Sequence, residues 1–102
     1  MSPAVPLNLP LKVQGQTMHL HGSVNFDNAA QIYQQGLLML QQHQHWPLLL
    51  DLSGLEASNT IALAVFVQWV RQCKAGQNIV LQHTPEKMQS IIDASNLQAA
   101  FA

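Results

Sequence analysis

The stretch from Leu48 to Gln82 constrains the fold of this chain more than any other part of the sequence. It reads as a strand, a polar loop, a long apolar helix, a glycine and a second strand: LLLDLSGLEASNTIALAVFVQWVRQCKAGQNIVLQ. Two strands joined through a helix pair in parallel, because the helix provides the long crossover that parallel pairing needs. The stretch therefore predicts an α/β domain.

The residues before this stretch predict a hairpin followed by a helix. Apolar residues alternate from Leu7 to Val13, and Pro10 within this run favours an edge strand. Gln14-Gly15 turns the chain into a second alternating run over residues 17–22. Good helix formers then fill Ala29–Gln42, where an internal glycine suggests a close backbone approach.

The whole pattern predicts one α/β domain with the element order ββαβαβα and a mixed sheet packed against helices. Residues 1–6 read as a flexible extension and residues 7–102 as the domain. We expect the apolar run Leu48–Leu52 to form a central strand covered on both faces. The later elements are expected to be a helix from Thr60 to Ala75-Gly76, a strand at Ile79–Leu81 and a helix at Pro85–Ala94.

Composition limits the classes of partner. Only 9% of the residues are charged and the net charge is −1, so nothing predicts binding to nucleic acid or to an acidic membrane surface. The single cysteine, Cys73, excludes an internal disulfide and fits a reducing cytoplasm. No apolar run approaches the roughly 20 residues that cross a membrane, so we expect no direct membrane insertion.

The second predicted helix is more apolar than a single sheet requires. On a helical wheel, the apolar residues of Ile61–Lys74 cover an arc of roughly 200°, about twice the width of a stripe that faces a core. Two explanations remain open. The C-terminal helix packs beside it and buries the excess, or the excess is exposed and Phe66 or Trp69 anchors a partner.

Histidines and nucleophiles offer weaker signals. His19 with His21, and His43 with His45, form two pairs that resemble metal ligands, but a solvated strand face and a helix end explain them equally well. The sequence lacks a G-x-S-x-G elbow and a glycine-rich phosphate loop. We therefore expect no enzyme activity, no metal and no cofactor.

Three segments together resemble the STAS domain family (sulfate transporter and anti-sigma factor antagonist). They are the strand end Leu50-Asp51-Leu52-Ser53, the helix entry Asn59–Ala64, and Gly76 followed by strand Ile79–Leu81. The likeness extends over about Leu9–Leu97 and implies the same element order. Within the family the chain looks most like the cytoplasmic STAS subunit of the bacterial Mla phospholipid ABC transporter.

This resemblance implies a function in outer-membrane lipid asymmetry. Such subunits bind the transporter's ATPase, in complex with its permease, and are peripheral on the inner membrane through that partner. The alternative is an anti-sigma factor antagonist regulated by phosphorylation of the motif hydroxyl, here Thr60. Two positions depart from the family pattern, because Asn59 replaces an acidic residue and Ile61 replaces a small one. The residues expected to contact the partner are Ser58, Asn59, Thr60, Ile61, Phe66 and Trp69.

Overall fold

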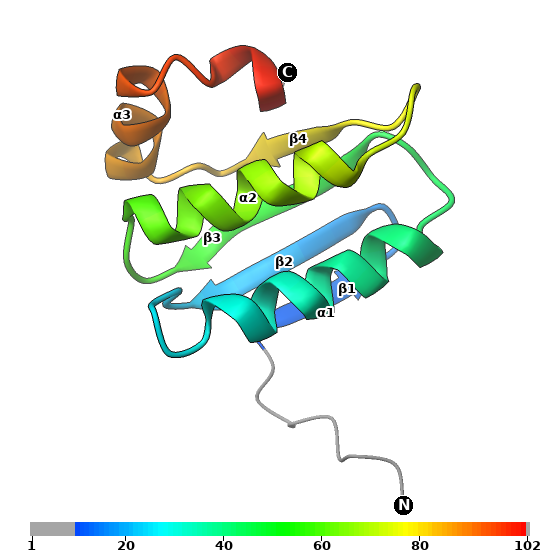
Figure 1. Ribbon diagram of the computed structural model, residues 1–102, viewed down its shortest axis with the longest axis horizontal. Helices are drawn as coiled ribbons and strands as arrows, with labels where there is room; N and C mark the ends of the chain where they lie inside the picture. The colour runs from blue at the N-terminus through cyan, green and yellow to red at the C-terminus, as the bar shows by residue number, and fades with distance from the viewer. Residues whose placement is uncertain (1–9, 102) are drawn as a thin grey trace, which may run out of the picture.

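The computed structural model describes residues 10–101, which form one sheet with helices packed against it (Figure 1). The predicted extension at residues 1–6, and the first three residues of the predicted first strand, lie outside the described residues. The elements are β1 (Leu11–Gln14), β2 (Thr17–Gly22), α1 (Ala29–Gln42), β3 (Leu48–Leu55), α2 (Thr60–Gln72), β4 (Ile79–Gln82), α3 (Glu86–Ala94) and the short 3₁₀ helix η1 (Gln98–Phe101).

The strands lie side by side in the order β1-β2-β3-β4. The hairpin β1–β2 is antiparallel and turns at Gly15, whose φ of 60° suits a glycine. β2, β3 and β4 are parallel, and α1 and α2 provide the two crossovers. The ββαβαβα order and the mixed sheet are therefore confirmed, β1 is the predicted edge strand, and η1 is an addition that the sequence did not predict.

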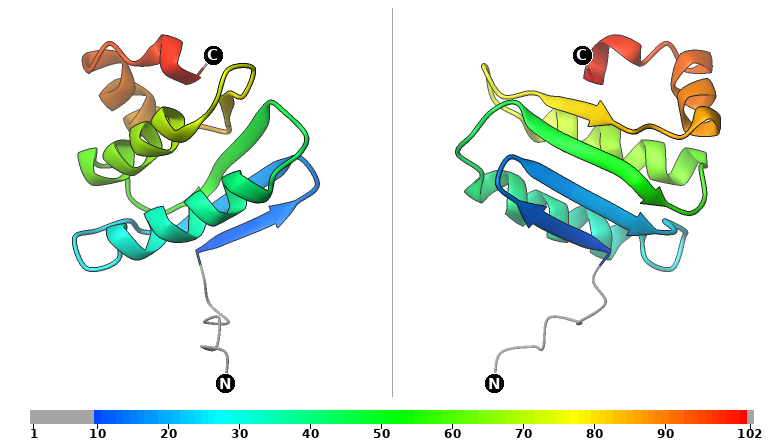
Figure 2. Two further views of the ribbon diagram at one scale, coloured as in Figure 1. Left: turned by 45° about the vertical axis from the view of Figure 1, so that its right-hand side comes forward. Right: turned by 180° about the vertical axis from the view of Figure 1, so that it is seen from behind.

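Helices α1 and α2 lie across the same face of the sheet, while α3 and η1 lie beyond β4 (Figures 1 and 2). Alternate residues of β3, such as Leu50 and Leu52, are fully buried beneath the helices. Seen from behind, no helix among residues 10–101 covers the other face (Figure 2). The expectation that β3 is covered on both faces was wrong, because Leu49 and Ser53 alternate onto a face that is open.

The contact between α1 and α2 depends on Gly36 and Trp69. A Cβ atom on Gly36 would overlap the indole ring of Trp69, so only glycine leaves room for this packing. The indole Nε1–H of Trp69, in α2, donates a hydrogen bond of 3.0 Å to the carbonyl oxygen of Tyr33, which lies in α1 like Gly36. The close backbone approach predicted at this glycine is confirmed, and a large aromatic side chain occupies the space.

Phe66 and Trp69 are not available to a partner. Both are fully buried, and their rings are stacked with centroids 5.9 Å apart. The broad apolar arc of α2 is covered by the sheet beneath, by α1 on one side and by α3 and η1 on the other. We therefore correct the expectation that Phe66 and Trp69 form part of the partner-binding surface, because both rings complete the core.

Helix α2 also ends earlier than expected. Its last residue is Gln72, and Cys73 takes an extended conformation with its N–H bonded to the carbonyl of Val70. Gly76, with a φ of 83°, shapes the turn into β4 instead of capping the helix. The helix itself begins at Thr60 as predicted.

Candidate docking surface at the start of helix α2

Asn59 joins the start of α2 to a neighbouring loop. It is the N-cap residue, and its Oδ1 accepts a hydrogen bond of 2.8 Å from the backbone N–H of Ala62. Its Nδ2 donates a second bond of 3.0 Å to the carbonyl of Val24, in the loop between β2 and α1. One neutral side chain therefore satisfies a free helix donor and fixes the two loops relative to each other.

The other predicted contact residues at this end are accessible to different degrees. Thr60 is the first residue of α2 and is exposed, while Ser58 and Ile61 are half-buried. The structure thus brings Ser58, Asn59, Thr60 and Ile61 to one end of the molecule. It separates them from the two buried aromatic residues that the sequence grouped with them.

A shallow apolar groove begins beside the start of α2 and runs between the first halves of α1 and α2. Its volume is about 230 Å³. Small and aliphatic side chains form most of its walls, and no charged residue lines it. Its lining residues are Ala29, Ala30, Tyr33, Ile61, Ala64, Val65 and Gln68. Ile61 therefore belongs both to the predicted site and to the groove.

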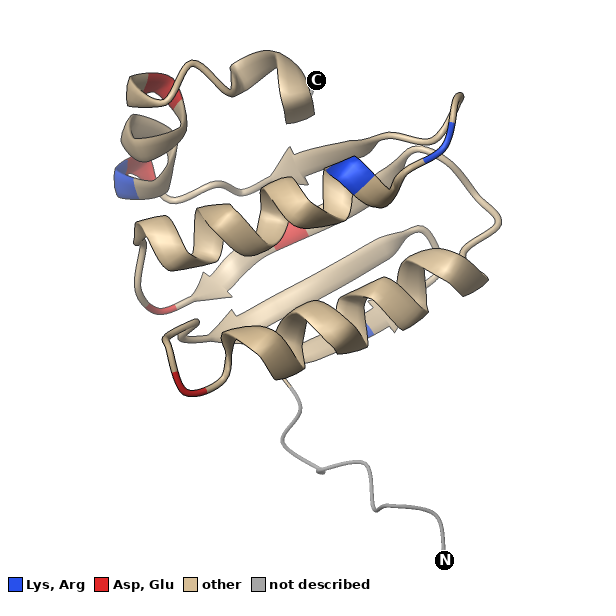
Figure 3. Ribbon diagram, viewed as in Figure 1, with Lys and Arg blue, Asp and Glu red and all other residues tan. Residues whose placement is uncertain are grey.

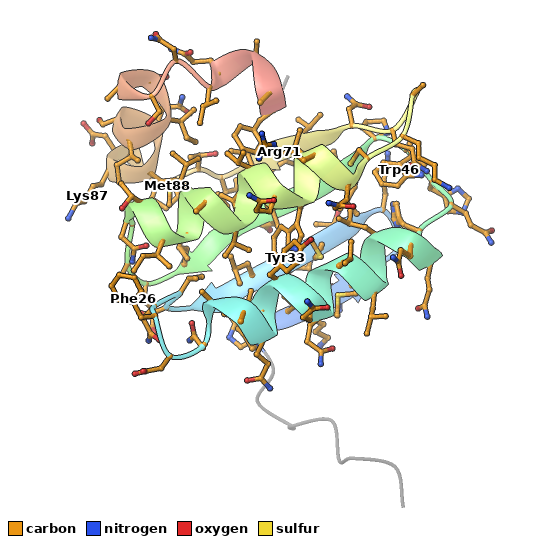
Figure 4. All side chains as sticks on the ribbon, viewed as in Figure 1. Phe26, Tyr33, Trp46, Arg71, Lys87 and Met88 are labelled. Carbon is orange, nitrogen blue, oxygen red and sulfur yellow. The ribbon has the colours of Figure 1, made fainter. Side chains whose placement is uncertain are left out.

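Phe26 stands at the same end and was missed by the sequence analysis. Its side chain is 90% exposed, in the loop that Asn59 contacts (Figure 4). The loop is braced around it, because Asn25 Oδ1 accepts hydrogen bonds from the backbone N–H groups of Asp27 and Asn28. Asn28 Oδ1 in turn accepts from the N–H of Asn25. A lone apolar residue among turn-forming residues carries no periodic signal.

Charge is distributed unevenly around the two helices (Figure 3). Asp27 and Glu56 are exposed in the two loops at the Phe26 end, and Glu56 is held beside Gly22 by a backbone hydrogen bond of 2.8 Å. Arg71 lies at the opposite end of α2, and it is the only charged residue in α1 and α2 together. The helical surface between the two ends is therefore uncharged.

The open face of the sheet carries a cluster that the sequence only partly indicated. Asp51, which is 8% exposed, lies between two imidazoles. Its Oδ2 is 3.1 Å from His19 Nδ1 and its Oδ1 is 3.2 Å from His83 Nδ1. The backbone N–H of Ser53 also donates to Oδ1. This bond is the main cause that lowers the pKa of Asp51 below its ordinary value, against the opposing effect of burial. Hydrogen bonds from the Ser53 and His83 side chains lower the pKa further.

The histidines singled out in the sequence have separate surroundings. His19 contacts Asp51, while His21 lies beside Gly54, and His43 makes an edge-on ring contact with Trp46 at 5.3 Å. Among residues 10–101, no group of three or more His, Cys, Asp or Glu side chains converges as metal ligands would. His83 reaches Asp51 from a left-handed backbone conformation, with a φ of 53°, that sequence reasoning could not foresee.

A second hollow lies at the far end of the helical layer. It has a volume of about 410 Å³ and is lined by residues including Trp46, Cys73 and Lys74. Burial raises the pKa of the Cys73 thiol, so this sulfur is a poor nucleophile at neutral pH. In the described part of the chain, no helix is both long enough and apolar enough to cross a membrane.

A family profile described as "Mlab, STAS domain" matches residues 7–100. The chain belongs to this STAS domain family. A chain from the Acinetobacter MlaFEDB complex in the ATP-bound Vtrans2 conformation is 43% identical, with a TM-score of 0.76 over 82% of this chain and 88% of that chain. A chain from the same complex in the ATP-bound Vtrans1 conformation is 41% identical, with a TM-score of 0.77 over 85% and 92%. No curated protein matches the sequence.

Proposed function

We propose that this chain is a non-catalytic accessory STAS subunit that binds and supports the ATPase of a bacterial phospholipid-transport ABC system. The main support for this proposal is structural and sequence similarity to chains from the MlaFEDB complex in ATP-bound conformations. The similarity extends over more than four fifths of the chain. On this proposal the subunit lies in the cytoplasm, held at the inner membrane by the ATPase and its permease. The anti-sigma antagonist reading is not favoured by these relatives.

The side chains at the candidate surface support binding rather than catalysis. A catalytic site combines a nucleophile or a general base with a partner within hydrogen-bond reach, inside a cleft. At the start of α2, the side-chain amide of Asn59 forms hydrogen bonds with two backbone groups, and Thr60 is exposed on the surface. This is an arrangement for holding two loops in fixed positions, as a docking surface requires.

The proposed contact surface consists of Ser58, Asn59, Thr60 and Ile61. Thr60 at the first helical position points its backbone N–H out of the helix, where the helix dipole is positive. A carboxylate or phosphate at Thr60 is therefore compatible with the folded free chain. If a partner protein buries the same charge without an opposite charge beside it, the free energy of binding becomes less favourable by roughly several kcal/mol.

Co-purification tests this proposal. The chain should be recovered in stoichiometric amount with a tagged ATPase that is expressed together with its permease. Thr60→Glu should reduce recovery about tenfold or more, since about 1.4 kcal/mol corresponds to a tenfold change. Gln44→Glu adds the same charge in an exposed loop at the opposite end of the molecule and should leave recovery unchanged.

The outcomes separate two levels of the proposal. If the unmodified chain is not recovered with the ATPase, the assignment as an ATPase-binding subunit is overturned. If the unmodified chain is recovered but Thr60→Glu behaves as Gln44→Glu does, the chain binds through another surface. Circular dichroism of both variants establishes that a lost interaction does not arise from unfolding.

A further inference from the structure

Phe26 is the most exposed large apolar side chain in the described part of the chain, at 90%. Single exposed apolar residues are common on protein surfaces and need no explanation alone. Phe26 differs because four hydrogen bonds in its own loop hold the backbone beneath it, including one of 2.8 Å from Asn28 Nδ2 to the carbonyl of Ser23. A rigid aromatic ring loses little conformational entropy when a partner covers it.

Phe26 stands three residues before Ala29, which lines the apolar groove between α1 and α2. The Asn59–Val24 hydrogen bond connects the Phe26 loop to the start of α2, where Ile61 lines the groove. Ala30 and Ala64 are exposed on its two walls, and such small side chains allow another helix to approach closely. The chain therefore presents an exposed ring and an apolar groove at the same end of the molecule (Figure 4).

Charge identifies the chemistry of the occupant. Asp27 and Glu56 lie in the two loops beside Phe26, whereas α1 carries no charged residue and α2 only Arg71 at its far end (Figure 3). A two-fold contact between two copies through Phe26 would bring these carboxylates toward their equivalents, which is unfavourable. An anionic lipid surface would be repelled for the same reason. The surface fits a protein with basic residues beside an apolar patch.

We propose that Phe26 is the aromatic anchor of the docking surface, and that its partner is a helix of the ATPase subunit. That helix places an apolar side chain in the groove, receives the Phe26 ring in an apolar pocket, and sets Lys or Arg side chains opposite Asp27 and Glu56. This inference rests on the proposed function and deepens it, because it adds residues outside the STAS motif to the contact. Phe26 replaces the buried Phe66 and Trp69 as the aromatic contact.

Binding measurements with single variants test the inference. The ATPase–permease assembly, purified without this subunit, is immobilised, and the dissociation constants of purified variants are measured. Phe26→Ala should weaken binding about 30-fold or more, as truncating an interface hot spot does. Leu38→Ala is the matched control, because Leu38 is a 53% exposed apolar residue of α1 outside the groove, and it should stay within about threefold.

Two further variants test the groove and the charges separately. Ala64→Glu places a carboxylate in the groove at an exposed helical position and should weaken binding about tenfold or more. Asp27 and Glu56 hold their loops through backbone N–H groups, so their side chains can be changed. The double variant Asp27→Lys, Glu56→Lys should slow association at low salt and lose most of its effect at high salt.

The outcomes distinguish this inference from the proposal beneath it. An unmodified chain that fails to bind the assembly defeats the proposed function. An unmodified chain that binds, with Phe26→Ala within about threefold of it and folded, overturns the anchor. Concentration-dependent dimers of the unmodified chain that Phe26→Ala abolishes, or flotation with anionic vesicles that it abolishes, would also overturn the assignment, by identifying a different occupant.

Discussion

Two aromatic side chains on the same helical layer meet opposite environments. Trp69 lies in the middle of α2, is fully buried, fills the space above Gly36 and donates a hydrogen bond to Tyr33. Phe26 stands on a braced loop at the end of the layer and is 90% exposed. The sequence presents both as large apolar residues. Which of them supports folding, and which is free to bind, depends on neighbours distant in the sequence.

The contrast between Trp69 and Phe26 indicates that residues important for stability and residues available for binding lie in different regions of the molecule. Truncating a side chain in the Trp69 region should lower the free energy of unfolding, and any effect on a partner would follow from unfolding. Truncation in the Phe26 region should leave folding intact and change affinity alone. Five substitutions test this division, in order of decreasing effect on stability.

Trp69→Ala should have the largest effect. Removing a buried aromatic side chain costs about 3–5 kcal/mol through lost burial and the cavity left behind. It also leaves the Tyr33 carbonyl without its indole donor. Urea denaturation followed by circular dichroism measures the loss. A variant less than about 1 kcal/mol below the parent would show that the core does not depend on this ring.

Gly36→Ala should destabilise the chain by about 1–3 kcal/mol, because its Cβ would overlap the Trp69 ring and force α1 away from α2. Helix propensity alone predicts the opposite sign, a gain of about 1 kcal/mol. The sign of the change in the urea midpoint therefore decides between packing and propensity. Ala30→Gly, at an exposed position of the same helix, is the control and should lose only about 1 kcal/mol.

Asp51→Asn should cost about 1–2 kcal/mol at neutral pH, since it removes the charge from hydrogen bonds with the Ser53 backbone and two histidines. The fold lowers the pKa of Asp51 below its ordinary value, so the ionised carboxylate stabilises the chain at neutral pH. This contribution falls as the pH drops through the folded pKa. Unfolding curves of parent and variant should therefore converge in acid; a constant gap from pH 3 to 7 would contradict the assignment.

Asn59→Ala should cost about 1 kcal/mol, the usual loss on removing a helix N-cap. Asn59→Asp separates the two functions of the side chain, because aspartate still caps Ala62 but cannot donate to the carbonyl of Val24. If the link between the loops positions Phe26, Asn59→Asp should weaken binding to the ATPase assembly more than it lowers stability. If Asn59→Asp binds as tightly as the parent, the hydrogen bond from Asn59 to Val24 is not needed for docking.

Phe26→Ala should have the smallest effect on folding, within about 0.5 kcal/mol of the parent, because an exposed ring makes few contacts to lose. Its affinity for the ATPase assembly should nevertheless fall furthest. If the urea midpoint drops together with the affinity, Phe26 contributes to the stability of the fold as Trp69 does. The distinction between the two regions would then be wrong.

The element order could be predicted because each element has a clear local pattern. Alternation identified the hairpin strands, and the bounds predicted for α1, Ala29–Gln42, agree with the structure. The start of α2 at Thr60 was predictable because Asn59 is a strong N-cap residue. These features depend on residues close together in the sequence, so a single sequence suffices to predict them.

The candidate surface was harder to predict, because it depends on packing between distant segments. A helical wheel shows that α2 is broadly apolar but not which neighbours cover it, so Phe66 and Trp69 were assigned to the surface although α1 and the sheet bury them. Phe26 has no periodic partners to mark it. His83 reaches Asp51 only through a left-handed turn. Each of these errors concerns a contact between residues that are far apart in the chain.

The amide of Asn59 has one consequence for how such a subunit works over time. Neither of its two hydrogen bonds involves an ionisable group, so a change of pH or of ionic strength does not remove either bond. A carboxylate at the same position would lack the donor to Val24 and would respond to both conditions. The chain thus carries a connection between two loops that does not depend on the protonation state of any side chain.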